Sequence, residues 1–105
     1  MAVNHKQVYM DAFGHKWGAW VACECCEGTA HDIHHIKARG SGGSKLWDFV
    51  ENLMALCRDC HREYGDITEL RPELVRIHEL RMMAAGLVPD QQKLEWVRNG
   101  RCYEQ

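Results

Sequence analysis

Two cysteine pairs with the same spacing constrain this chain more than any other feature of its sequence. Cys23 and Cys26 form the first Cys-x-x-Cys motif, and Cys57 and Cys60 form the second. Two intervening residues let both sulfurs of a pair reach one ion from a tight turn, and four thiolates complete the tetrahedral set that zinc prefers. The sequence therefore predicts a structural zinc ion that joins two distant segments of the chain.

The remaining thiols leave alternatives to this interpretation. Cys25 competes with Cys26 as a ligand, and we favour Cys26 because it gives both pairs the same spacing. Thiols that merely pack as small apolar groups are disfavoured by the two matched pairs. Disulfides require an oxidising compartment, and the N-terminus lacks the basic and apolar leader of a secreted protein, so we expect zinc and a cytoplasmic location.

Length and charge limit what the chain can be. Its 105 residues suit a single domain over 1–105, in which a structural metal supplements a small core. We expect a leader over 1–22, a zinc-bearing core over 23–65 and a helical extension over 66–105. No apolar run is long enough to span a membrane, so we expect no membrane partner. A net charge of −2 gives no general support to a nucleic-acid partner, and any attraction for phosphate must be local.

Positive charge gathers in one glycine-rich loop. Lys37, Arg39 and Lys45 are the candidate phosphate contacts there, because the glycines between them let the backbone approach a phosphate closely. An ordinary hairpin connection with solvated charges accounts for the same residues equally well.

Hydrophobic patterning predicts a small α+β fold. A strand is expected over residues 29–36, and the apolar run 53–56 predicts a buried strand that leads to the second cysteine pair. A helical turn or two is expected over 60–64. Residues 70–84 repeat apolar side chains in steps of three and four, which predicts a long helix, and a shorter helix is expected over 89–98.

The long helix carries two further predictions. Its start has capping-box spacing between Asp66 and Glu69, and Pro72 suits its first turn. One face carries an apolar stripe, which consists of Leu70, Leu74, Ile77, Leu80 and Ala84. The stripe either covers the small core of a monomer or pairs two copies as a homodimer, and we favour the core.

Trp17 and Trp20 precede the first cysteine pair. We expect both rings to pack in the core or over the zinc-binding turn, because buried aromatic area dominates small cores. A platform on which nucleobases stack is the less favoured interpretation.

Three histidines lie near the cysteine motifs. A four-cysteine zinc site does not need His34, His35 or His61, and neutral imidazole is a common ligand of divalent ions, so they suggest a second metal centre with open positions. A metal there stabilises charge on a phosphoryl oxygen, while a spare imidazole takes a proton from the attacking water. The Asn52 amide can fix the tautomer of that base or add an oxygen ligand.

Together these motifs resemble the HNH endonucleases of the zinc-bearing ββα-metal type. The order is Cys23-x-x-Cys26, His34-His35, Asn52 and Cys57-x-x-Cys60-His61. The sequence is similar especially to the short HNH proteins of bacteriophages and bacteria, and the resemblance covers residues 23–65. It implies a ββα-metal core, made of a β-hairpin and a short helix and stapled by the four cysteines.

The resemblance also implies a role for each residue. His34 and His61 would hold one catalytic divalent ion, which is Mg²⁺, Mn²⁺, Ni²⁺ or Zn²⁺, and His35 would be the general base. Asn52 would order the loop, orient His35 or, as in some relatives, touch the metal. The structural Zn²⁺ would be held by Cys23, Cys26, Cys57 and Cys60. Successive strand residues point to opposite faces, so His34 and His35 can face one phosphate only where the strand is bent or bulged.

The function that this resemblance implies is the hydrolysis of phosphodiester bonds in DNA by one metal ion and a histidine base. Its substrate would be double-stranded DNA in the cytoplasm of a bacterial or phage-infected cell, and nicking and double-strand cleavage both remain open. The alternative is a non-catalytic, zinc-stapled module that binds nucleic acid or another protein.

Overall fold

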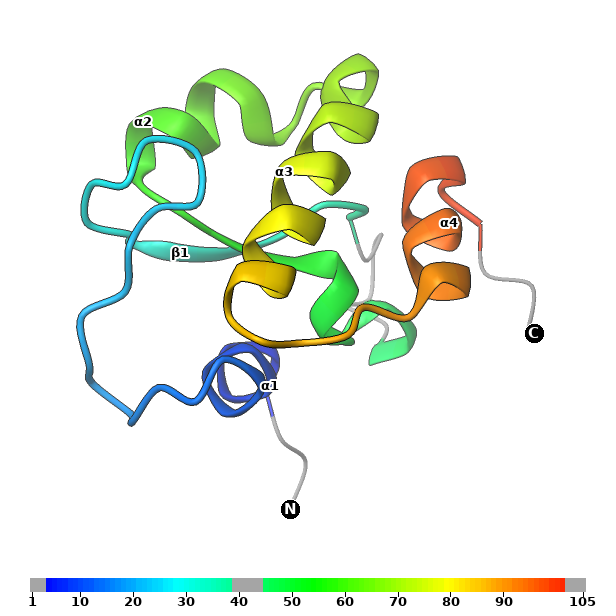
Figure 1. The fold of residues 1–105 in the computed structure, drawn as a ribbon. Helices are drawn as coiled ribbons and strands as arrows, with labels where there is room; N and C mark the ends of the chain where they lie inside the picture. Colours follow the sequence, from blue (N-terminus) through cyan, green and yellow to red (C-terminus); the bar gives the residue numbers. More distant parts are fainter. Residues whose placement is uncertain (1–3, 39–44, 102–105) are drawn as a thin grey trace.

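The computed structural model describes residues 4–38 and 45–101 of the chain (Figure 1). Arg39 and most of the glycine-rich loop lie outside these ranges. The described chain forms short helices and two strands, in this order: α1 (His5–Ala12), β1 (Asp32–His35), η1 (Lys45–Trp47), η2 (Val50–Asn52), β2 (Leu53–Leu56), α2 (Arg58–Cys60), η3 (His61–Gly65), η4 (Thr68–Leu70), α3 (Arg71–Ala84) and α4 (Gln91–Asn99). Of the η elements, η3 is a π-helix and the others are 3-10 helices.

The two strands form an antiparallel hairpin at the centre of the molecule. Asp32 pairs with Leu56 and His35 with Leu53, and the pairing between these ends is uninterrupted. Every residue of β2 is buried, because α1 covers one face of the strand while α3 and α4 cover the other (Figure 1). A strand buried on both faces needs a continuous apolar run, which explains the sequence of β2. The predicted α+β hairpin with C-terminal helices is confirmed.

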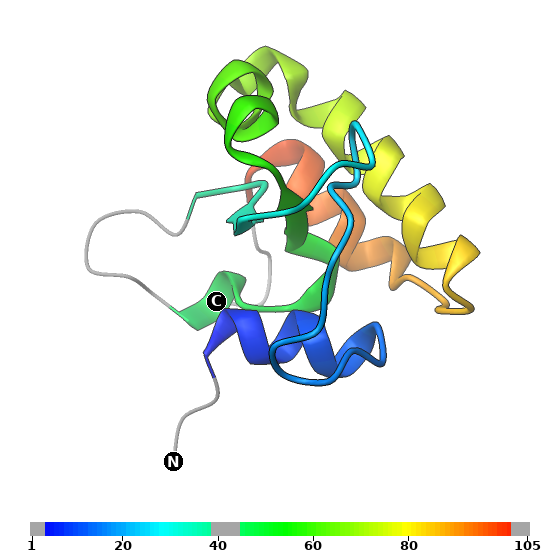
Figure 2. The same ribbon diagram turned by 90° about the vertical axis from the view of Figure 1, so that its left-hand side faces the viewer.

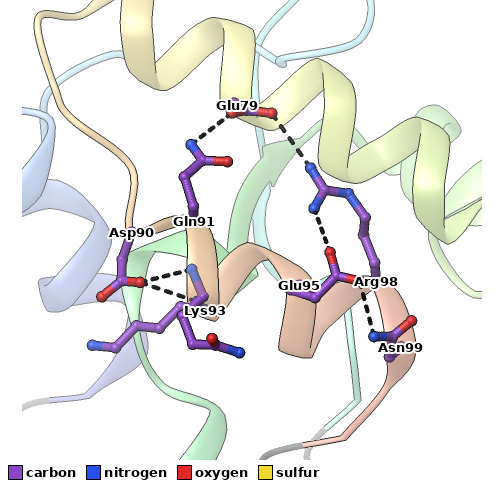
Figure 3. Close-up of polar contacts among 8 residues, drawn as sticks. Glu79, Asp90, Gln91, Lys93, Glu95, Arg98 and Asn99 are labelled. Carbon is purple, nitrogen blue, oxygen red and sulfur yellow. Dashed lines mark hydrogen bonds and ion pairs between the residues drawn. The ribbon is translucent and has the colours of Figure 1, made fainter.

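Polar contacts hold α4 against α3 (Figure 3). Glu79 of α3 accepts hydrogen bonds from Gln91 Nε2 at 3.0 Å and from Arg98 Nη2 at 3.5 Å. The Asp90 side chain caps α4 by accepting from the backbone N–H groups of residues 92 and 93. On the inner side of α4, Leu94, Trp96 and Val97 complete the core cluster that β2 and α3 share.

The start of α3 differs from the prediction. Leu70 is the N-cap and its side chain makes no capping bond, while Asp66 is the C-cap that follows η3 and Thr68 begins η4. The capping box between Asp66 and Glu69 is therefore wrong. A 3-10 turn inserted between η3 and α3 moved the helix start downstream, whereas Pro72 does lie in the first turn as predicted.

The buried face of α3 also differs from the predicted stripe. Leu74, Val75, His78 and Met82 are buried, whereas Leu80 is 54% exposed and Ala84 is exposed. The prediction considered apolar residues alone. The helix is rotated so that His78 also faces the core. The partner that makes this burial possible is a carboxylate described below.

Trp17 and Trp20 do not pack in the core. Their rings are 64% and 63% exposed, so the prediction of burial is wrong. The core cluster beneath this part of the chain is already filled by α1 and β2, with Tyr9, Met10, Leu53 and Ala55 as its buried members. The segment between α1 and the first cysteine pair therefore passes over the surface of the molecule.

Within residues 4–38 and 45–101, no helix is both long enough and apolar enough to span a membrane.

Candidate active site

The four predicted zinc ligands meet in space. Sulfur atoms of Cys23, Cys26, Cys57 and Cys60 all lie within 4.8 Å of one another. Cys26 Sγ and Cys57 Sγ are 3.7 Å apart, close to the edge of about 3.8 Å expected for a tetrahedron with Zn–S bonds of about 2.3 Å. The donor set and its dimensions therefore suit zinc.

Backbone N–H groups donate to sulfur atoms of these four residues, hereafter the cysteine group. The N–H of Cys60 donates to Cys57 Sγ at 3.4 Å. Burial acts to raise the pKa of Cys23, but backbone hydrogen bonds from neighbouring cysteines outweigh it and lower the pKa to about 7. Cys25 is not part of the group, and burial with nearby negative charge raises its pKa to about 11. Of the two upstream candidates, the geometry brings Cys26 to the ion-binding position.

A buried ion pair ties the first cysteine turn to the helices. The Glu24 carboxylate accepts from Tyr9 Oη at 2.7 Å, from the N–H of Ala55 at 3.1 Å and from His78 Nδ1 at 2.7 Å. His78 Nε2 donates to Val50 O at 2.7 Å. Since both ring nitrogens face acceptors, His78 is an imidazolium. Burial alone lowers the pKa of His78, but the hydrogen bond and charge of Glu24 raise it overall. Sequence analysis gave no role to His78.

A second group of donors lies beside the cysteines. His34, His61 and Asp66 each offer an atom within 4.8 Å of the others, and the two imidazole centroids are 4.5 Å apart. Two nitrogens and one oxygen form a site for a divalent ion that leaves coordination positions open. We refer to these residues as the histidine group. Asp66 was not predicted, because the capping-box interpretation had assigned it another role.

Consecutive residues Cys60 and His61 belong to different groups. Cys60 ends α2 and His61 begins the π-helix η3, and adjacent residues on a helix point in different directions. The sequence Cys57-x-x-Cys60-His61 thus contributes side chains to both groups.

Gly65 provides the floor of the histidine group. A methyl group at this position would lie 2.7 Å from His61 Cδ2 and 3.3 Å from His34 Nε2, so only glycine leaves room for both rings. The carbonyl of Gly65 lies 2.8 Å from His34 Nε2. Burial and the neighbouring His61 lower the pKa of His34, which favours the neutral form that binds metal. The space beside Gly65 therefore accommodates both imidazoles as candidate metal ligands.

A carboxylate orients His61 from outside the group. Asp32 Oδ2 lies 3.0 Å from His61 Nδ1. A carboxylate accepts only, so Nδ1 carries the proton and Nε2 is left to bind a metal. Asp32 and His34 lie two residues apart on β1 and point to the same face of the strand, toward η3.

His35 occupies the opposite face of β1. Its Nε2 lies 2.7 Å from Asp48 Oδ1, and its ring centroid is 4.5 Å from that of His5 on α1. The bond to Asp48 places the proton on Nε2 and leaves Nδ1 as the basic nitrogen. Neither Asp48 nor His5 was singled out by sequence analysis, because both are distant from the histidine pair along the chain.

His35 and one member of the histidine group border the same hollow, and the strand has no bulge. His35 is the last residue of β1, and it lines a hollow of about 90 Å³ together with Gly65, Asp66 and Arg71. The hollow therefore lies beside the candidate base and beside Asp66 of the histidine group. His34 points to the other face of β1, as strand alternation requires, so Asp66 makes the contact between that group and the hollow.

Among the described residues, the Asn52 side chain hydrogen-bonds to backbone groups. It is fully buried, its Oδ1 accepts from the N–H of Lys37 at 2.7 Å, and its Nδ2 donates to the carbonyls of Lys37 and Trp47 at 3.0 Å each. These bonds tie together the two ends of the glycine-rich loop. Of the three roles that the resemblance implies for Asn52, its contacts fit the ordering of the loop.

The predicted phosphate contacts have separate positions. The Lys37 ammonium donates to Ala38 O at 2.8 Å and lies 5.2 Å from the Trp47 ring centroid. Lys45 is exposed at the start of η1, and Arg39 lies outside the described residues.

Arg71 supplies positive charge that sequence analysis missed. It lines the hollow beside His35, and its buried Nε has no hydrogen-bond partner within 4–38 and 45–101. A methyl group on Gly100 would lie 2.7 Å from Arg71 Nη1 and 3.5 Å from Lys37 Cε, so these two cationic side chains approach each other. Two cationic side chains close to each other favour an anion beside them.

Comparison with known proteins identifies the central segment. Residues 23–66 match the family model described as HNH endonuclease. The chain matches none of the curated proteins and none of the solved structures with which it was compared.

Proposed function

We propose that the chain is a metal-dependent endonuclease that hydrolyses phosphodiester bonds in DNA, because residues 23–66 match the family model described as HNH endonuclease. One observation supports this most strongly: His35 and the ligand candidate Asp66 line the same small hollow. A candidate proton acceptor and a candidate metal group thus border a space open to a phosphate. This is the pairing that hydrolysis of a phosphodiester requires.

His35 is the proposed general base. With its Nε2 proton directed at Asp48, Nδ1 would take a proton from the attacking water as the water oxygen bonds to phosphorus. The P–O bond to the leaving alkoxide breaks, and the alkoxide takes up a proton from water. Asp48 acts through His35, as a positioning residue that fixes its tautomer and ring orientation. The contact with His5 restricts the ring from its other side.

His34, His61 and Asp66 are the proposed ligands of the catalytic ion. Asp32 keeps Nε2 of His61 unprotonated, and Gly65 leaves space for both imidazoles. A divalent ion bound there supplies Lewis-acid stabilisation of the negative charge that develops on phosphoryl oxygens. The four cysteines would hold Zn²⁺, which has a structural role in this proposal.

Arg71 and Lys37 are the proposed phosphate contacts. Arg71 lines the hollow, and a guanidinium can donate two parallel hydrogen bonds to one phosphate. The net charge of −2 does not by itself attract DNA. Positive charge at the contacted surface is sufficient for such attraction, and Arg71 and Lys37 supply it here.

The test is cleavage of supercoiled plasmid with Mg²⁺, Mn²⁺ or Ni²⁺ added separately. The wild-type chain should nick or linearise the plasmid with at least one of these metals. The variant His35→Ala should keep its fold and zinc while its rate falls about 10²- to 10⁴-fold, the usual contribution of a general base. Absence of cleavage with every metal, together with a mobility shift of intact plasmid, would instead favour a zinc-stapled DNA-binding module.

A further inference from the structure

Trp17 and Trp20 border a groove that the proposed catalytic hollow does not include. The groove has a volume of about 420 Å³, and its walls come from α1, from the segment before the first cysteine pair and from the first half of β1. Both rings are about two-thirds exposed. Two large, exposed aromatic side chains that line the same concave surface are typical of a binding site rather than of ordinary protein surface.

The ring of Trp20 is held in place although it is exposed. Its Nε1 donates to Thr29 Oγ1 at 3.1 Å. The backbone around it is also fixed, because Ala22 and Thr29 form a β-bridge and the N–H of Ala30 donates to Val21 O at 2.9 Å. A ring that is already oriented loses little conformational entropy when a flat ligand stacks on it.

Trp20 borders open space beyond this groove as well. It lines a second hollow of about 330 Å³ together with Phe13 and His15. Trp20 thus borders both concavities, and a planar group has space to lie against its exposed ring.

The groove adjoins the proposed active site through β1. Asp32 lines the groove, and the same carboxylate orients His61. From Asp32 to His35 the strand advances roughly 10 Å, at about 3.3 Å per residue. In Figure 2, β1 lies between the blue segment before the cysteines and the green helices that carry His61. One nucleic-acid strand can therefore reach both places.

The charges in the groove suit a nucleotide. Lys6 and His31 line it, and its acidic member Asp32 is already bonded to His61. A nucleotide presents a flat apolar base together with an anionic phosphate, which matches two indole rings beside an ammonium group. An apolar peptide segment would leave the ammonium of Lys6 without a matching charge.

We infer that this groove binds an unpaired nucleobase of the DNA strand whose phosphate enters the hollow between His35 and Asp66. The inference rests on the proposed function. Paired bases inside a duplex are covered on both faces by their neighbours, so only an unpaired base can stack on Trp17 or Trp20. The substrate class is therefore DNA with a single-stranded segment next to the cleaved bond, and stacking supplies affinity that the net charge does not.

The experiment measures binding of fluorescein-labelled oligonucleotides by anisotropy in the His35→Ala background, which keeps the DNA intact. The probes are a short single-stranded oligothymidylate, the same strand with abasic sites in place of its central nucleotides, and a blunt duplex of equal length. Trp17→Ala and Trp20→Ala should each weaken binding of the oligothymidylate about 5- to 100-fold. Trp17→Phe, which keeps an aromatic ring, should recover most of that affinity.

The abasic strand separates stacking from attraction to phosphate. Replacing either tryptophan should leave its affinity and that of the blunt duplex unchanged. An equal loss for the abasic strand, or no loss for any probe, overturns the inference and leaves the groove to an apolar partner. Binding through the groove does not depend on cleavage, so a chain that stacks bases but cuts no plasmid disproves the proposed function alone, and the converse result disproves the groove alone.

Discussion

The cysteine group and the histidine group adjoin each other in the chain, yet they are assembled in different ways. The cysteine group consists of two Cys-x-x-Cys pairs, and backbone N–H groups near each pair donate to its sulfurs. The histidine group has candidate ligands from three places in the chain. His34 lies on β1, His61 begins η3, and Asp66 directly follows η3. Its ligands are oriented by Asp32 and by the shape of Gly65.

The difference suggests that the cysteine group stabilises the fold and that the histidine group takes part in the reaction. A closed set of four thiolates leaves no position for a substrate, whereas the two nitrogens and one oxygen of the histidine group do. In a core this small, the first group can hold the backbone of the second in place. Damage to the cysteines should therefore affect both groups, and damage to the histidine group should affect only itself.

The largest expected effect is that of Cys57→Ser. Loss of one thiolate removes most of the zinc-binding free energy, which is about 10–16 kcal/mol in small zinc domains, and the chain should unfold. Circular dichroism and zinc analysis of the purified variant test this. Cys25→Ser is the matched control and should retain both zinc and fold. A folded, zinc-loaded Cys57→Ser protein would contradict the assignment.

The next largest effect is expected at the ion pair behind the first cysteine turn. His78→Leu leaves the buried Glu24 carboxylate without its cationic partner. The free energy of unfolding, measured with denaturant, should therefore fall by about 3–5 kcal/mol. Adding Glu24→Gln to that variant should recover part of the loss, because no buried charge then remains. If the single and double variants are equally stable, the pair is not coupled.

The same pair has a pH signature with a definite sign. The pKa of His78 is raised above its ordinary value of 6.5 by Glu24, against the effect of burial. Its stabilising contribution is therefore complete below about pH 6.5 and is lost as the pH rises through the higher pKa of the folded protein. The stability difference between wild type and His78→Leu should shrink at high pH.

A smaller effect is expected from Gly65→Ala, which affects the histidine group alone. The added methyl group would meet His61 Cδ2 at 2.7 Å and displace a proposed ligand. We expect the affinity for the catalytic metal to fall about 10- to 100-fold, as for other changes in the surroundings of a ligand. Calorimetric metal titration measures this, and unchanged zinc content is the internal control. Simultaneous loss of zinc would show that the two groups are not separable.

The smallest effect is expected from Arg71→Gln. Loss of one phosphate contact should weaken DNA binding about tenfold and reduce the slope of log affinity against log salt by about one. Arg76→Gln is the control on the same helix, since Arg76 is exposed and pairs with Glu73. Equal effects of the two substitutions would remove Arg71 from the phosphate site.

The sequence alone determined the features that depend on short-range spacing. The paired Cys-x-x-Cys turns, the apolar run of β2 and the two C-terminal helices were all predicted from residues close together in the chain, and so was the HNH resemblance. Such patterns are legible because a turn, a buried strand or a helix imposes its own local periodicity. The α+β fold follows from them.

Only the tertiary structure decided which distant side chains meet. Asp48 lies against His35, Arg71 and Asp66 border the same hollow, and Glu24 pairs with the buried His78. No local pattern marks these residues, because each acts across a contact that exists only after the helices have packed around the hairpin. For the same reason Trp17 and Trp20 were misplaced: apolar character predicts burial, but the core beneath them had already been filled by α1 and β2.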